Sequence, residues 1–287
     1  MLSPKRVLSL ALLLAAGCRT VAPALAVPTA MQVTVRAPGV EFALTGARAD
    51  SGELGRLGSG LLEAIGLVRR WGSLRGVVQV RVLESHAALE DLFDRHDHVW
   101  LRAWSNGGAI FVQSPRTWDE SEKQARSMVP QLLTHELTHV LMYQQLEPDG
   151  DPPWWLTGLQ PEEPPLWFVE GMASVTASQK RMLPSELQGW LSAHPGVNPL
   201  EPDAELVRTE KEAVYGAAHR AFERLLEQGG DQPVRDVLRG MRAGARFGDA
   251  FAAATGRQVA TFEREALTAG FATRAEPKLP ARGAGGP

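Results

Sequence analysis

The pattern of apolar and polar residues predicts alternating strands and helices in the first part of the chain. Residues 31–44, MQVTVRAPGVEFAL, alternate between the two kinds of side chain and predict a strand. Residues 52–72 have helical spacing interrupted by glycines, and residues 75–85, RGVVQVRVLES, predict a second strand with alternate valines on one face. Two strands around a helix indicate a small α/β lobe.

The following segments extend this lobe and then become helical. Residues 86–96, HAALEDLFDRH, predict a helix, and residues 99–115 predict a pair of strands that turn near Asn106. From Glu120 onward nearly every segment has helical spacing, apart from a proline-rich loop at 148–165.

We therefore expect an α+β fold. A small α/β lobe with a mixed sheet, about 32–118, is followed by a mainly helical lobe, about 119–275. The tail 276–287 lacks the apolar residues that a core requires and is expected to be disordered. The chain contains no internal repeat.

The first residues have the layout of a secretory signal. A short basic start precedes an apolar run over residues 7–16, which is too short to span a bilayer. The sequence around Cys18 resembles a bacterial lipobox, in which residues 1–17 are removed and Cys18 is lipidated. A plain cleaved signal with an incidental Cys18 is the alternative, because Ala15 stands where leucine is commoner.

Both interpretations place the protein outside the cytoplasm, and lipidation would anchor it in the bacterial cell envelope, periplasmic or surface-exposed. Arg19 follows the cysteine instead of aspartate, which favours the outer membrane by analogy with enteric bacteria. Residues 18–31, rich in alanine and proline, are expected to serve as a tether. Cys18 is the only cysteine, so it cannot form a disulfide within the chain.

Composition narrows the classes of partner. The chain has 287 residues, of which 44% are hydrophobic and 22% are charged, with a net charge of −3. Its basic residues are scattered and form no stripe, so the electrostatic footprint of nucleic-acid binding is absent from the sequence. We expect a globular monomer that does not bind nucleic acid.

A metal-binding pattern lies in the helical lobe. The segment QLLTHELTHVLMYQQ, residues 131–145, contains H-E-x-x-H at His135, Glu136 and His139. Four residues advance a helix by about 400°, so the two imidazoles emerge one turn apart and can reach one ion. Zn²⁺ binds neutral imidazole, while Glu136 can act on a water molecule. The alternative is a pair of core histidines with satisfied hydrogen bonds.

A catalytic zinc ion has three protein ligands, so a third must be found. The metzincin extension is excluded, because glutamine stands where its third histidine would be. Glu170 lies downstream in PPLWFVEGMASV, where Pro165 can open a helix. Leu166, Val169 and Met172 would bury one side of that helix. A carboxylate in apolar surroundings is expected to be paired or metal-bound, and the alternative is a surface glutamate on an amphipathic helix.

Together, these two segments resemble the gluzincin metallopeptidases. HELTHVL followed by PLWFVEGMAS is similar to the bacterial peptidase-MA-like group, in which both segments share one zinc ion. The resemblance covers about residues 75–272, and within it GGAIFVQSP resembles the edge strand that lines the cleft of that family. Ser174 departs from the pattern, because some gluzincins have an aspartate there that buttresses a histidine. The departure implies weaker activity.

The resemblance implies a zinc metallopeptidase that holds one Zn²⁺ per chain on the two histidines and Glu170. Glu136 would assist the attack of a zinc-bound water on a bond of a peptide or protein substrate. The family has a tyrosine near the cleft at about the position of Tyr215, which would stabilise the oxyanion, and His219 is the second candidate. For each, an ordinary packed side chain is the alternative.

A non-catalytic zinc-containing lipoprotein with a binding or assembly role is the alternative function, although a structural zinc site requires four protein ligands. The cluster from His96 to His98 lies among charged residues and is interpreted as a solvated helix end. Trp154 and Trp155 either pack or cover the cleft.

Overall fold

The structure is a computed structural model that describes residues 30–268, apart from 95, 97, 119–120, 148–163 and 180. Several features named above lie outside the described residues: the signal sequence, Cys18, most of the tether, Trp154, Trp155 and the C-terminal tail.

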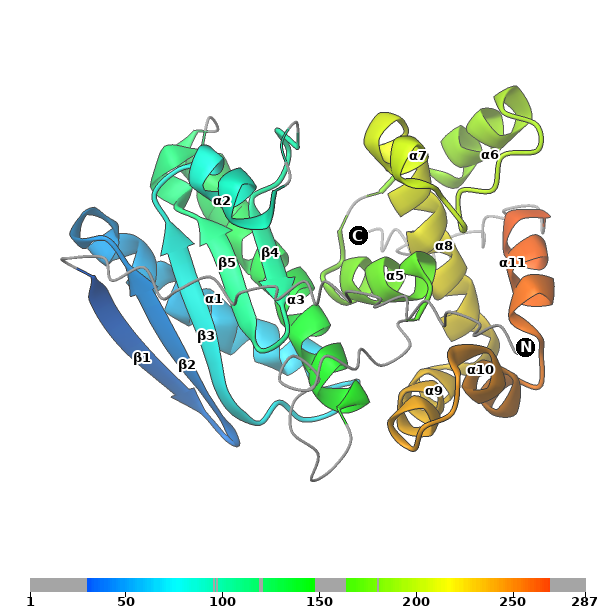
Figure 1. Ribbon diagram of the computed structural model, residues 1–287, viewed down its shortest axis with the longest axis horizontal. Helices are drawn as coiled ribbons and strands as arrows, with labels where there is room; N and C mark the ends of the chain where they lie inside the picture. Colours follow the sequence, from blue (N-terminus) through cyan, green and yellow to red (C-terminus); the bar gives the residue numbers. More distant parts are fainter. Residues whose placement is uncertain are drawn as a thin grey trace, which may run out of the picture.

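A five-stranded mixed sheet forms the N-terminal lobe, in the order β1-β2-β3-β5-β4 (Figure 1). Its strands are β1 (Met31–Ala37), β2 (Val40–Gly46), β3 (Gly76–Leu83), β4 (Ala103–Asn106) and β5 (Ala109–Gln113). β2, β3 and β5 run parallel, while β1 and β4 pair antiparallel with their neighbours. The expected mixed sheet is confirmed.

Two details of the sheet differ from the expectations. Residues 31–44 were expected to form a single strand, but they contain β1 and most of β2, because the chain turns at Pro38 and Gly39. Gly39 has a φ of +82°, which favours glycine. The segment GGAIFVQSP was expected to be the edge strand, but it contains β5, which pairs with β3 on one side and β4 on the other. The sheet edge on this side is β4.

Helices follow the sheet and also cover it. They are α1 (Ser51–Val68), α2 (His86–Phe93), α3 (Glu122–Leu146), α5 (Leu166–Thr176), α6 (Pro184–Ala193), α7 (Ala204–Thr209), α8 (Lys211–Gly229), α9 (Gln232–Arg242), α10 (Phe247–Thr255) and α11 (Val259–Thr268), with 3-10 turns at Arg48–Asp50 and Pro115–Thr117. None of the described helices is both long enough and apolar enough to cross a membrane.

The two faces of the sheet have different cover. Phe93 of α2 packs edge-on against Phe111 of β5, with ring centroids 5.1 Å apart, so α2 lies on the face that carries Phe111. Val78, Val80 and Val82 of β3 are buried on the opposite face, as their alternation predicts. Helices α1 and α3 pack together behind that face (Figure 1).

Helix α3 lies between the sheet and α5, so it belongs to the boundary of the two lobes (Figure 1). A buried hydrogen bond joins the lobes beside it: Trp71 Nε1, in the turn after α1, donates to Thr176 Oγ1 of α5 at 2.6 Å. The Trp71 ring also meets Phe222 of α8 edge-on, at 5.7 Å. The residues of the H-E-x-x-H pattern therefore lie where the lobes meet.

Candidate metal centre

The middle of α3 carries three polar side chains in an apolar helix. Leu133, Leu137 and other apolar residues of α3 fill the core. His135, Glu136 and His139 are also buried, with exposed fractions of 8%, 6% and 8%. Buried polar groups are costly without partners, so each of the three side chains requires one.

The opposing carboxylate comes from α5, which approaches α8 very closely. A Cβ atom on Gly171 would lie 2.5 Å from the carbonyl oxygen of Ala218 and 2.6 Å from Cβ of Phe222. Only glycine allows the two helices to pack at this distance. The neighbouring Glu170 is thereby positioned opposite the histidines of α3.

The buried face of α5 differs in part from the expected one. Met172 is fully buried, as expected, but Leu166 and Val169 are only half-buried. Trp167 and Phe168 are fully buried in their place. The difference arises because α3, α8 and α10 contact α5 from several sides, as the contacts of Trp167 and Phe168 with aromatic rings of α8 and α10 show.

The two histidines and Glu170 converge on one point. His135 Nε2 lies 3.1 Å from His139 Nε2 and 3.3 Å from Oε2 of Glu170, and His139 Nε2 lies 3.6 Å from Oε1 of Glu170. A tetrahedral ion with ligand bonds of about 2.0–2.2 Å separates its ligand atoms by about 3.3–3.6 Å. The spacing and the donor set of two imidazoles and a carboxylate fit a zinc ion.

Burial and the contacts among these three side chains shift the pKa of each one. Burial would raise the pKa of Glu170, but His139 and His135 outweigh this effect and lower the pKa to about 2. Burial lowers the pKa of His139 to about 4, so its imidazole is neutral near pH 7. Burial also opposes protonation of His135, but the hydrogen bond and negative charge of Glu170 outweigh it and raise the pKa of His135.

Glu136 lies against the edge strand β4. Burial raises the pKa of Glu136 to about 6, although the hydroxyl and the backbone N–H of Ser105 both donate hydrogen bonds to it. Ser105 thus holds the Glu136 carboxylate beside the converging group. Sequence reasoning did not assign Ser105 a role, and its place in a predicted pair of strands was the only signal for it.

His219 lies on α8 and is not among the three converging side chains. Its Nδ1 atom is 3.0 Å from Oγ of Ser174, and its Nε2 atom is 3.5 Å from Oε1 of Glu223. Ser174 therefore binds His219, not a histidine of α3. The Nδ1 atom of His135 is buried, and none of the described residues forms a hydrogen bond with it.

Tyr215 lies close to a residue that the sequence analysis missed. The guanidinium of Arg181 stands over the Tyr215 ring, 5.3 Å from its centroid, and Trp100 meets the same ring edge-on at 6.0 Å. Arg181 also interacts electrostatically with Glu170. Arg181 follows α5 in a segment without any motif, so no pattern pointed to it.

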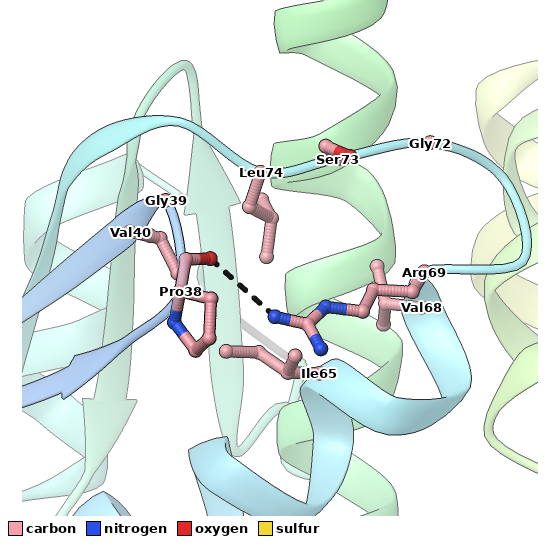
Figure 2. A pocket seen from close by; sticks show the side chains of 9 residues that line it. All are labelled: Pro38, Gly39, Val40, Ile65, Val68, Arg69, Gly72, Ser73 and Leu74. Carbon is pink, nitrogen blue, oxygen red and sulfur yellow. Dashed lines mark hydrogen bonds between the residues drawn. The ribbon is translucent and has the colours of Figure 1, made fainter.

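Two other features could be candidate sites: the histidines after α2 and a hollow beside the end of α1. His96 is 58% exposed and lies 3.4 Å from Asp94, which is typical of a solvated helix end. A hollow of about 430 Å³ lies between the β1–β2 turn and the end of α1. Figure 2 shows Arg69 at this hollow, reaching towards the carbonyl oxygen of Pro38. Neither place contains a residue of the converging group. Among the described residues, only His135, His139 and Glu170 form a group of this kind, with ligand atoms within 4.8 Å of one another.

Comparisons with protein-family models and with curated proteins found no match. Among solved structures, the chain is similar to Legionella pneumophila aminopeptidase A in complex with aspartic acid, with 12% identity, a TM-score of 0.49, and coverage of 83% of this chain and 28% of that one. It is also similar to an M1 zinc metallopeptidase from Deinococcus radiodurans, with 13% identity, a TM-score of 0.44, and coverage of 83% and 51%. The chain spans at most about half the length of these two proteins.

Proposed function

We propose that this protein is a zinc metallopeptidase. The observation that carries the proposal is the convergence of His135, His139 and Glu170 at zinc-ligand spacing, with Glu136 buried beside them. Two ligands and a candidate base thus come from one turn of α3, and the third ligand comes from α5. The similarity of the donor set to hydrolytic zinc sites supports peptide-bond hydrolysis.

The chain's own residues supply the other parts of the reaction. A bound Zn²⁺ would act as a Lewis acid and lower the pKa of a water molecule at its open position. Glu136, with a pKa of about 6, can take the proton of the attacking water near neutral pH and return it to the departing amine. The edge strand β4 can hold an extended substrate by backbone hydrogen bonds.

The number of ligands argues against a purely structural zinc site. A structural site is closed by four protein ligands, whereas a catalytic one keeps a position open. The group of ligating side chains contains three residues in the part of the chain that the structure describes. An open position beside a buried carboxylate favours hydrolysis over the alternative of a non-catalytic zinc lipoprotein.

Three substitutions test the proposal because they separate binding from chemistry. His139→Ala and Glu170→Ala should each remove a ligand and lower bound zinc toward zero. Glu136→Gln keeps the shape but cannot accept the proton, so zinc should stay near one per chain while turnover of a cleaved peptide falls by about 10²- to 10⁴-fold. His194→Ala is the control, since His194 stacks on Trp190 of α6 and should keep both zinc and turnover.

The outcomes separate the parts of the proposal. Stoichiometric zinc in Glu170→Ala would show that Glu170 is not a ligand. Hydrolysis by Glu136→Gln at the rate of the unmodified protein would show that the site binds metal without the assigned chemistry. Zinc content is measured by mass spectrometry, and turnover by cleavage of a peptide library.

We also propose lipid anchoring in the cell envelope, supported by the sequence LLAAGC that ends at Cys18. The full-length protein expressed in a Gram-negative host should partition with membranes, and Cys18→Ser should release it or leave the precursor uncleaved. Equal partitioning of both forms into the detergent phase would contradict the anchor. Fractionation of the two membranes tests the expected outer-membrane location.

A further inference from the structure

The segment after α5 is held beside the metal centre by two contacts. Nε2 of Gln131, one helical turn before His135 in α3, donates a hydrogen bond of 2.9 Å to the carbonyl oxygen of Ser178. On the other side, Met182 packs against α8 so closely that a Cβ atom on Gly216 would lie 2.9 Å from its Cβ. Arg181 lies between these anchors, and its position is therefore determined by α3 and α8.

Arg181 is a largely buried cation that lacks a carboxylate partner among the described residues. Its Nη2 atom donates to Oε1 of Gln179 at 2.5 Å, and its Nε atom is buried without a hydrogen-bond partner. Glu170 and Glu212 influence it electrostatically, but neither forms an ion pair with it. A guanidinium in such surroundings is stabilised by an anion that binds to it.

The sign of this charge indicates what part of a substrate binds here. The carboxylates of Glu170 and Glu136 are engaged with the histidines and with Ser105. Glu212 has a side chain that is 63% exposed, so its effect is screened by solvent. A substrate ammonium group close to Arg181 would be repelled by its positive charge. A carboxylate would gain charge-assisted hydrogen bonds from the guanidinium fork.

We propose that Arg181 binds a substrate carboxylate close to the scissile bond, and that it makes the site selective for peptides with a negative charge at that position. This inference rests on the proposed peptidase function and names its substrate class. The carboxylate can be the free C-terminus of a short peptide or the side chain of an acidic residue. In both cases Arg181 acts as a specificity residue.

A binding experiment tests the proposal without relying on turnover. The zinc-loaded Glu136→Gln protein is titrated calorimetrically with three peptides: a tetrapeptide with a free C-terminus, its C-terminal amide, and an amide with aspartate in the last position. We expect a carboxylate-bearing peptide to bind about 10- to 100-fold more tightly than the uncharged amide. The free acid and the aspartyl amide distinguish the two sources of the carboxylate.

Substitution of the arginine assigns the preference to this residue. Arg181→Gln, added to the same protein, should abolish the difference, and Arg181→Lys should keep part of it because the charge remains without the fork. Arg36→Gln is the matched control, because Arg36 is exposed on β1 at the far edge of the sheet and should leave the preference intact (Figure 1). Circular dichroism verifies that each variant is folded.

Two results would overturn the proposal: equal affinity for all three peptides, or a preference that survives in both Arg181 variants. In the protein with Glu136 intact, Arg181→Gln should raise KM for the carboxylate-bearing peptide and leave KM for the amide unchanged. Carboxylate-selective binding without any cleavage would refute the peptidase function alone. Cleavage without carboxylate preference would refute the role of Arg181 alone.

Discussion

The close approach of α5 and α8 makes Gly171→Ala a sharp test of how the centre is assembled. The added methyl group would lie 2.5 Å from the carbonyl oxygen of Ala218, whereas ordinary contact begins at 3.4 Å. The shortfall of about 0.9 Å is against backbone, which cannot rotate away. Helix α5 must therefore move away from α8 and carry Glu170 with it.

The magnitude follows from two opposing effects. Overpacking of a well-packed core costs about 1–3 kcal/mol, and the contact with backbone places this case near the upper end. Replacing glycine by alanine inside a helix raises the stability of the helix by about 1 kcal/mol. We expect a net decrease of about 2 kcal/mol in the free energy of unfolding. Because Glu170 moves, zinc affinity should also fall by about 10-fold or more.

Gly66→Ala in α1 is the matched control, because a Cβ atom there meets nothing within 4 Å. It should raise the free energy of unfolding by up to about 1 kcal/mol and leave zinc affinity unchanged. Urea unfolding of the metal-free proteins measures stability, and competition with a chelator measures zinc affinity. The inferred helix contact would be refuted if Gly171→Ala were as stable as the unmodified protein while Gly66→Ala was stabilised.

Three further predictions concern Ser105, the zinc ion and the buried Glu263. Ser105→Ala removes one of the hydrogen bonds to Glu136, so turnover should fall by up to about 10-fold at unchanged zinc content, and a loss of zinc would contradict this role. Removal of zinc by a chelator should lower the free energy of unfolding. The expected decrease is about 2.7 kcal/mol relative to protein with free zinc at 100 times its Kd. An unchanged melting temperature would argue against a zinc site. Burial raises the pKa of Glu263 above 4.5 despite the hydrogen bond from Trp167, so stability should decline as pH rises through the pKa of the folded state. Glu263→Gln should therefore be more stable than the unmodified protein at pH 8 but not at pH 4, which urea unfolding at both values measures.

Several parts of the fold and site followed from local pattern. Residues four apart in any α-helix lie one turn apart, so His135 and His139 had to face the same way once α3 formed. Alternating valines predicted the buried face of β3, because side chains of a strand point alternately to opposite faces. Glu170 could also be proposed, since a carboxylate in an apolar segment requires a partner.

Contacts between distant segments decided the rest. Helix packing around α5 buried Trp167 and Phe168. Ser174 contacts the His219 ring of α8 and not a histidine of α3. Strand order made β4 the edge that presents Ser105 to Glu136. Local periodicity contains no information on which strand is outermost or which helices meet. The sequence by itself therefore determined the candidate ligand pair and the candidate base. Only the tertiary structure determined how Glu136 is held and that a cation, Arg181, stands beside the site, because both depend on backbone positions set by packing far along the chain.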